Sequence, residues 1–190
     1  KRVGAALARS LHQHGYRIAL HYRQAKAEAQ SVANALNALR PDSCLLLQAD
    51  LSMSAERDAL IPQIIGHYGQ LDVLINNASS FSPTPIGSAS DAHWDDLFNS
   101  NARAPLFLSQ AAAPYLRKQQ GCIINIADIY AVNPKPQHTV YCMAKAALLM
   151  MTKSLALELA PEVRVNAIAP GAILWPEAGM SEQSQTAMVE

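Results

Sequence analysis

The sequence predicts a doubly wound α/β fold, in which helices cover both faces of a parallel sheet. Segments with helical spacing of apolar residues alternate strictly with short segments that are apolar almost throughout, and half of the 190 residues are hydrophobic while only 16% are charged. Strands that are apolar on both faces are typical of parallel sheets, and right-handed crossovers then place helices on either side. We expect one domain over residues 1–190. It should be incomplete at both ends, because Lys1 enters a helical pattern almost at once and Glu190 stops inside a polar, helix-compatible run.

The first half of the chain alternates helix and strand. Leu7 and Leu11, among small alanines, predict a short amphipathic helix that Gly15 can end, since glycine adopts the left-handed conformation at little cost. After a strand, Val32 and Leu36 recur at helical spacing, and a Pro-Asp pair breaks that pattern before a second apolar run. The predicted order is a helix ending near residue 15, then strand 16–22, helix 25–39, strand 44–47 and helix 54–68.

The second half continues the alternation. A strand over 72–76 is followed by a loop over 79–90 rich in Ser, Pro and Gly, and a loop of that length in a compact domain is more often functional than idle. In a doubly wound sheet, ligands lie beyond the carboxyl ends of the strands, so functional residues are expected just after them. The remaining predicted elements are helix 91–116 with a break near Ala104-Pro105, strand 122–126, helix 139–159 and strand 164–169.

Composition narrows the classes of function. Lys+Arg and Asp+Glu both number 15, so no overall field favours nucleic acid or an anionic membrane. No uninterrupted apolar run reaches the ~18 residues that a membrane span needs, and the N-terminus is not a signal peptide. Three cysteines without paired ligand spacing and six scattered histidines indicate neither a disulfide framework nor a metal site, so a soluble protein of the reducing cytoplasm is expected.

Basic residues are concentrated in the first 40 positions, where seven of them face only Glu28. Such a surface suits a polyanionic ligand, and a solvated basic surface remains the alternative.

Tyr141 and Lys145 are the first candidates for catalysis. Four residues apart in a predicted helix, they project from one face. A phenol with an ordinary pKa of about 10 is a poor acid–base catalyst at neutral pH, but a cation within ~4–6 Å favours the phenolate. The pair could therefore make a tuned proton donor, although taken alone the spacing is common and also fits a plain pair on a helix surface.

Other polar residues fall where the fold places ligand contacts. They are Asn76-Asn77-Ala78 after one strand, Asn101 in a helix, Asp128 after the next strand, and Arg164-Val165-Asn166 with Pro170-Gly171 around the last strand. With Tyr141 and Lys145, and in this order and spacing, these residues resemble the short-chain dehydrogenase/reductase family over essentially the whole chain. The resemblance implies a Rossmann-like fold whose first strand, with the opening glycines of its first turn, is missing from this sequence, where Arg2 and Gly4 stand at the end of that turn.

The resemblance also implies catalytic roles. Tyr141 would donate a proton as hydride leaves the nicotinamide, Lys145 would hold the ribose and lower the pKa of Tyr141, and Asn101 would help order a proton-relaying water. The family's usual serine does not appear, because counting back 13 positions from Tyr141 reaches Asp128. Asp128, with the stretch from Asn76 to Phe81, is similar to the pteridine reductase branch.

A pterin substrate would explain why an aspartate, Asp128, stands where the family usually has a serine. A pterin presents ring nitrogens and an amino group, so the Asp128 carboxylate can accept hydrogen bonds from it and take part in proton delivery. Phe81 resembles the aromatic residue that stacks on the pterin in this branch, and flat heterocycles favour such faces. The expected substrate-binding residues are thus Phe81, Asp128 and Tyr141, with Phe81 as a loop anchor and Asp128 as a helix N-cap as the simpler alternatives.

NADP(H) is the expected cofactor. An NAD enzyme usually carries an acidic residue at the end of the second strand, but here Tyr22 is followed by Arg23, and a guanidinium suits a 2′-phosphate, with Arg2 as a helper. Asp50-Leu51 matches the family's contact with the adenine edge, unless Asp50 is only a turn aspartate. The expected cofactor-binding residues are Arg2, Gly4, Tyr22, Arg23, Asp50, Leu51, Asn77, Ala78, Ser79, Tyr141, Lys145, Pro170 and Gly171.

The sequence therefore predicts a reductase that transfers hydride from NADPH to a dihydropterin, or to a related folate. The alternatives are a short-chain reductase acting on a 3-oxoacyl thioester or another ketone, and a non-catalytic NADP-binding scaffold. The helix over 139–159 is apolar nearly all round, and such a helix needs burial on both sides. The resemblance implies a homo-tetramer in which this helix packs against its symmetry mate, whereas burial within one subunit would satisfy it equally.

Overall fold

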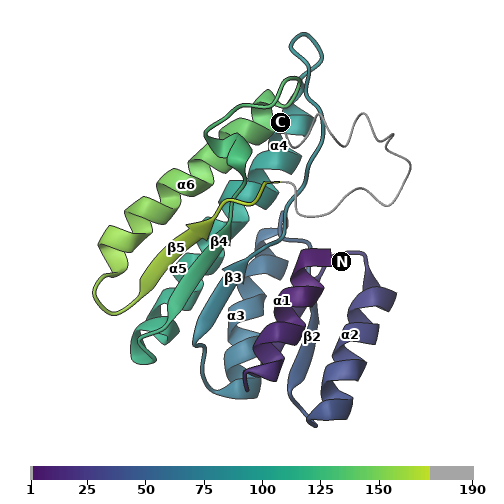
Figure 1. Cartoon of the computed structure of the whole chain (residues 1–190), viewed down its shortest axis with the longest axis vertical. Coiled ribbons are helices and arrows are strands. Elements are labelled where there is room, and N and C mark those ends of the chain that lie inside the picture. The colour runs from purple at the N-terminus through teal and green to yellow at the C-terminus, as the bar shows by residue number, and fades with distance from the viewer. Residues whose placement is uncertain (1, 172–190) are drawn as a thin grey trace.

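Parallel strands and helices alternate along the chain in the computed structural model, which describes residues 2–171 (Figure 1). The elements of the first half are α1 (Arg2–Gln13), β1 (Ile18–Tyr22), α2 (Lys26–Leu39), β2 (Cys44–Gln48), α3 (Ser54–Tyr68) and β3 (Val73–Asn76). Those of the second half are α4 (Asp91–Phe98), η1 (Asn99–Arg103), α5 (Ala104–Lys118), β4 (Cys122–Ile126), η2 (Ile129–Ala131), α6 (Thr139–Leu159) and β5 (Arg164–Ile168).

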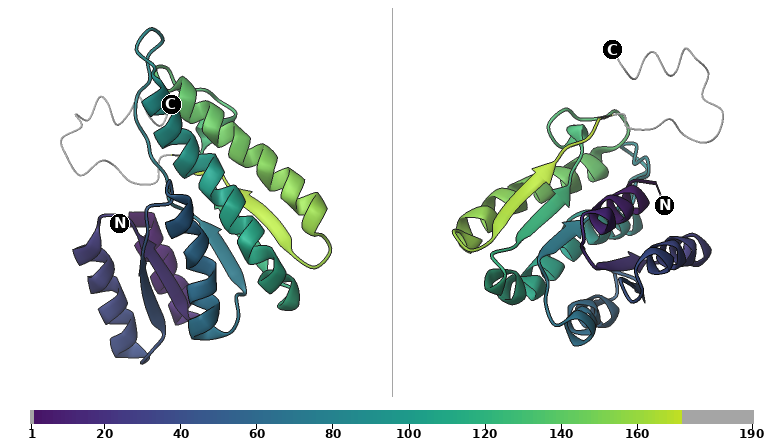
Figure 2. Two further views of the ribbon diagram at one scale, coloured as in Figure 1. Left: turned by 180° about the vertical axis from the view of Figure 1, so that it is seen from behind. Right: turned by 60° about the horizontal axis from the view of Figure 1, so that its bottom comes forward.

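The strands form two parallel sheets, where the sequence predicted one. β1 pairs with β2, and separately β3, β4 and β5 pair in that order. Within residues 2–171, β1 and β3 each have one edge that pairs with no other strand. Both of these free edges border a cavity of about 1640 Å³. The arrangement agrees with the predicted doubly wound fold that lacks its first strand, and α1 lies on the opposite face of the sheets from α3, α5 and α6 (Figures 1 and 2).

The break predicted near Ala104-Pro105 within helix 91–116 is present, because η1, a π-helical turn, separates α4 from α5, and Pro105 lies at the start of α5, where its missing N–H costs no hydrogen bond. The short 3-10 helix η2 was not predicted. Strand and helix limits otherwise shift by one or two residues, as when β1 begins at Ile18 rather than Tyr16.

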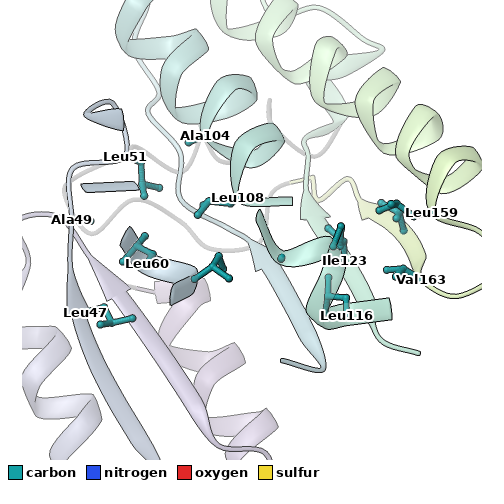
Figure 3. Close-up of a cluster of buried hydrophobic side chains, with 14 residues drawn as sticks. Leu47, Ala49, Leu51, Leu60, Ala104, Leu108, Leu116, Ile123, Leu159 and Val163 are labelled. Carbon is teal, nitrogen blue, oxygen red and sulfur yellow. The ribbon is translucent and has the colours of Figure 1, made fainter. Parts of the chain in front are cut away.

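One hydrophobic core joins the layers. Leu47 of β2, Leu60 of α3, Leu116 of α5 and Ile123 of β4 are buried members of a cluster that reaches Leu159 at the end of α6 (Figure 3). Burial of these side chains fixes the helices on the sheet, since each fully buried Leu or Ile contributes roughly 1.5–3 kcal/mol. The core thereby sets where the residues that follow β3, β4 and β5 lie.

Helix α6 is central to this arrangement. Of the residues described, it is the one helix long and apolar enough to cross a membrane by length and composition. It nevertheless packs on β5, η2 and α4 and carries Tyr141 and Lys145, so the structure uses it as a core helix.

Candidate active site

Tyr141 and Lys145 lie one turn apart near the start of α6 and are both buried, with 4% and 3% of their surfaces exposed. Lys145 Nζ donates to the carbonyl of Ile126, the last residue of β4, over 2.9 Å. The same nitrogen lies 5.7 Å from the centre of the Tyr141 ring. The structure therefore brings the predicted phenol and ammonium to the carboxyl end of β4.

Asp128 meets this pair from the strand side. Its Oδ2 accepts a hydrogen bond from the Tyr141 hydroxyl over 2.6 Å, and its Oδ1 accepts from the backbone N–H of Tyr130 over 2.9 Å. The second contact makes Asp128 the N-cap of η2. One oxygen of the carboxylate thus makes the helix cap that the sequence left open, and the other contacts the Tyr141 phenol.

The proton affinities at the site differ from the prediction that Lys145 would lower the pKa of Tyr141. Burial, the hydrogen bond to Asp128 and the Asp128 charge together raise the pKa of Tyr141, so its phenol is neutral. Burial lowers the pKa of Lys145 to about 8, and the Asp128 charge opposes this change. The physical reason is that a carboxylate contacts the phenol directly, whereas the ammonium is bonded to a backbone carbonyl.

Asn101 lies in the π-helical turn η1 and is 1% exposed. Its Nδ2 donates to the carbonyls of Ser80 and Leu97, over 3.0 and 2.9 Å. Its Oδ1 is buried and accepts no hydrogen bond from residues 2–171. Buried polar atoms are rarely unpaired, so this oxygen suits an ordered water, and the relay role of Asn101 stays a prediction.

Phe81 lies beside Tyr141, on the loop between β3 and α4. The two rings meet edge to face with centroids 4.8 Å apart, and the other ring neighbour of Phe81 is His138, stacked at 4.6 Å with an interplanar angle of 19°. Phe81 is nevertheless 53% exposed. A half-exposed aromatic ring next to the phenol could stack on a flat ligand.

The cavity between the edges of β1 and β3 is lined by most of the residues predicted to bind cofactor. Those lining it are Gly4, Tyr22, Arg23, Asp50, Leu51, Asn77, Ala78 and Ser79. Tyr141, Lys145, Pro170 and Gly171 do not line it, and the side chain of Arg2 lies outside what the structure describes, although its backbone begins α1. The lining residues that follow β1, β2 and β3 lie at the carboxyl ends of these strands, where doubly wound folds bind dinucleotides.

Gly4, Asp50 and Arg23 are three of the lining residues that were predicted to bind the cofactor. A Cβ added to Gly4 would come 3.0 Å from Asn77 Nδ2, so a larger residue there would have to displace the Asn77 side chain. Asp50 accepts hydrogen bonds from the hydroxyl and N–H of Ser52, which with the nearby Arg23 lower its pKa. Asp50 is therefore a turn aspartate that also faces the cavity, and Arg23 supplies positive charge beside it.

Pro170 and Gly171 lie on the far side of the site, after β5. The Pro170 carbonyl accepts from the backbone N–H of Ile129, and a Cβ on Gly171 would meet the Ile129 side chain at 3.7 Å. These contacts fix the segment after β5 against η2, close to Asp128.

A buried chain of side-chain hydrogen bonds forms the floor of the site. Asn76 Nδ2 donates to Asn125 Oδ1, Asn125 Nδ2 donates to Thr152 Oγ1, and Thr152 Oγ1 donates to the carbonyl of Leu148, each over 2.8 Å. Asn76 Nδ2 also reaches Ser109 Oγ at 3.3 Å. The chain links β3, β4, α5 and α6, the elements that carry the site.

Two residues near the site were missed by sequence reasoning. Thr84 is fully buried and contacts the start of α6, and His138 stacks on Phe81. Neither belongs to a recognisable motif, and no signal in the sequence could have found them. Within residues 2–171, no three His, Cys, Asp or Glu side chains gather in a way that could hold a metal ion.

Comparison with known proteins adds a family and named relatives. The family model described as short chain dehydrogenase matches residues 2–187. Pteridine reductase 1 of Leishmania tarentolae is 38% identical to this chain, over 93% of the chain and 75% of that protein. A 3-oxoacyl-acyl-carrier-protein reductase of Staphylococcus aureus is 33% identical, over 90% of the chain and 70% of that protein. An oxidoreductase of Methylorubrum extorquens that is described as uncharacterized is also 33% identical, over 92% and 70%.

Proposed function

The chain belongs to the short chain dehydrogenase family and is an oxidoreductase, and from this premise we propose that it reduces a dihydropterin with NADPH. The observation that carries the proposal is the 2.6 Å contact between the Tyr141 hydroxyl and Asp128 Oδ2. A carboxylate accepts hydrogen bonds from the amino group and ring N–H groups of a pterin, whereas the serine usual in the family suits a carbonyl oxygen. Similarity to a pteridine reductase supports the same substrate class.

The residues of the chain would handle the proton. Tyr141 holds it at the hydroxyl oxygen, because its raised pKa keeps the phenol neutral. Asp128 accepts the hydrogen bond from that hydroxyl, so the two side chains form one proton-holding pair, and a water on Asn101 Oδ1 would resupply it. Lys145, when protonated, would bring a positive charge to 5.7 Å from the centre of the Tyr141 ring.

Bound NADPH supplies the hydride in this proposal. Gly4 of α1, with Asp50 after β2 and Asn77 after β3, would contact it, and Arg23 would bind the 2′-phosphate with Arg2 as a helper. The end of β1 carries no carboxylate that would bind an unphosphorylated ribose, since Tyr22 is followed by Arg23 and then Gln24. Lys145 and Tyr141 would hold the nicotinamide ribose, and Pro170, Gly171, Ala78 and Ser79 would border the ring.

Steady-state oxidation of NADPH by the full-length enzyme tests the proposal. Dihydrobiopterin and dihydromonapterin are expected to be reduced, and Tyr141→Phe should lower kcat by a factor on the order of 10² or more while the protein still binds NADPH. If neither pterin is turned over, the substrate assignment is wrong. If Tyr141→Phe leaves both turnover and the biological readout unchanged, the non-catalytic NADP-binding scaffold becomes the better description.

Reduction of a 3-oxoacyl thioester is the second candidate, because 3-oxoacyl-acyl-carrier-protein reductases are also among the similar proteins. Acetoacetyl thioester is therefore included as a competing substrate. A thioester that outcompetes the pterins, or activity that survives Asp128→Ser, would favour this candidate.

The proposed assembly is a homo-tetramer, and three exposed apolar side chains on α6 support it. Met143, Met150 and Leu157 lie on the solvent side of this helix. Light scattering after size-exclusion chromatography should give four chains, and Met150→Glu should lower that number. We place the protein in the reducing cytoplasm, because the three cysteines are free and buried.

A further inference from the structure

Phe81 lies between two anchors of its loop. On one side, the backbone N–H of Ser80 donates to Ser100 Oγ over 3.1 Å, and the Ser80 carbonyl accepts from Asn101 over 3.0 Å. On the other side, Thr84 forms a parallel bridge with the segment that precedes α6. The ring is therefore flanked by fixed backbone on both sides although half of its surface is exposed.

Thr84 supplies a hydrogen-bond acceptor that the first turn of α6 otherwise lacks. His138, the residue preceding the helix, makes no side-chain cap, and Thr84 Oγ1 instead accepts from the backbone N–H of Val140 over 3.3 Å. The Thr84 N–H also donates to the carbonyl of Gln137, whose φ of 62° is a left-handed conformation that residues other than glycine rarely adopt. Because Thr84 is fully buried, water cannot replace either contact.

These contacts also determine where His138 lies. Its Nδ1 is 2.7 Å from the Pro136 carbonyl, which fixes the rotation of the ring, and the ring stacks on Phe81. Phe81 in turn meets Tyr141 edge to face. A continuous set of contacts thus runs from Thr84 through His138 to Phe81, the half-exposed ring beside the phenol.

We propose that Thr84 is a positioning residue that, through His138, holds Phe81 as the surface on which the pterin ring stacks beside Tyr141. The proposal rests on the proposed function and names further residues that determine substrate affinity. A preset aromatic ring binds a flat heterocycle more tightly than a mobile one, because ordering a side chain on binding costs free energy.

Kinetics of Thr84→Val and Thr84→Ser test the proposal in the full-length enzyme. Valine keeps the branched shape but removes the acceptor, and serine keeps the hydroxyl. With saturating NADPH, Thr84→Val is expected to raise KM for dihydrobiopterin on the order of five- to tenfold, while kcat and KM for NADPH stay within about twofold. Thr84→Ser should stay close to the parent enzyme, and an unchanged KM in Thr84→Val would overturn the proposal.

Ser88→Ala is the matched control. Ser88 lies in the same loop, but its hydroxyl donates to the carbonyl of Pro85 and does not reach α6. Loss of this hydroxyl should leave KM unchanged. An equal rise of KM in Ser88→Ala and Thr84→Val would mean that any loosening of the loop suffices, against a specific role of Thr84.

A double-mutant cycle asks whether Thr84 acts through Phe81. If it does, adding Thr84→Val to Phe81→Leu should raise KM by less than about twofold beyond Phe81→Leu alone, since the ring that Thr84 positions is already lost. Effects that multiply in the double variant would overturn the proposal.

Hydrogen exchange without substrate separates this proposal from the proposed function. Thr84→Val should accelerate amide exchange about tenfold in peptides covering residues 79–85 and 138–142, and Thr84→Ser should not. If no pterin is reduced and this acceleration still occurs, the positioning of Phe81 stands and the substrate is reassigned. Acceleration confined to 138–142 would make Thr84 a helix cap only and would overturn the proposal.

Discussion

Replacing Asp128 by asparagine should move the alkaline limit of activity to lower pH. Burial lowers the pKa of Lys145 to about 8, and the Asp128 charge is what opposes this change. The carboxamide keeps the shape of the side chain and one oxygen acceptor, but it carries no charge. We therefore expect the pKa of Lys145 to fall below 8 in Asp128→Asn, while the raised pKa of Tyr141 moves down toward its ordinary value.

The size of the shift follows from Coulomb's law. A unit charge ~8 Å away in an effective dielectric of ~20 contributes about 2 kcal/mol, which corresponds to somewhat more than one pKa unit. The Tyr141 ring, 5.7 Å from Lys145 Nζ, and its hydroxyl, 2.6 Å from Asp128 Oδ2, lie between the two charges and set a separation of that order. Lys145 is 3% exposed, so solvent screens little of this interaction. Activity that needs the Lys145 ammonium should thus be lost near pH 7 in the variant instead of near pH 8.

The assay is the pH dependence of kcat/KM for NADPH oxidation, which reports on the free enzyme. Glu158→Gln removes an exposed carboxylate from the far end of α6 and should leave the alkaline limit in place. Where Asp128→Asn turns over too slowly, the ¹⁵N chemical shift of Lys145 gives its pKa directly. An alkaline limit, or a Lys145 pKa, that is the same with and without the carboxylate would refute the reasoning.

Three further predictions concern packing, cofactor choice and linkage. Gly121→Ala places a Cβ on the Asp72 carbonyl oxygen and should lower the free energy of unfolding by roughly 2–4 kcal/mol, measured by calorimetry. Gly66→Ala in α3 meets no atom within 4 Å and should raise that free energy by ~0.5–1 kcal/mol. Equal effects of the two substitutions would contradict this prediction. Arg23→Ala should raise KM for NADPH about tenfold or more and leave KM for NADH unchanged, and a parallel change in both would exclude a 2′-phosphate contact. Between pH 8 and 10.5 the unfolded chain binds a proton that native Lys145 has lost, so denaturant titrations should show the parent protein gaining roughly 3 kcal/mol of stability relative to Lys145→Met across that window.

The order of the elements and the edge of the sheet at which the site forms could be predicted from the sequence. Short buried strands bounded by polar residues leave little choice for where each strand begins and ends. β3 ends at Asn76 and β4 covers Cys122–Ile126 as expected. Parallel pairing then brings Asn77 and Asp128 to one edge, and the helical spacing of four residues places the Tyr141 phenol next to that edge.

The contacts that give the site its chemistry could not be predicted in the same way. The partner of the Tyr141 hydroxyl depends on how the chain turns after β4, where Asp128 caps an unexpected 3-10 helix. The bond from Val140 to Thr84 joins residues 56 positions apart and depends on the path of a loop without periodicity. Burial of Tyr141 and Lys145 moves their pKa values in ways that the residue types alone do not indicate.

The hydrogen-bonded amides of Asn76 and Asn125 and the Thr152 hydroxyl beneath the site limit how the enzyme can move. Separating β4 from α6 would strand these groups in a dry interior, at about 1–3 kcal/mol for each one left without a partner. The base of the candidate site is consequently a rigid block, and opening for substrate entry must occur in the loops above it. Heating should then separate β3, β4 and α6 in one transition and not one element after another, whereas the loops can loosen at lower temperature.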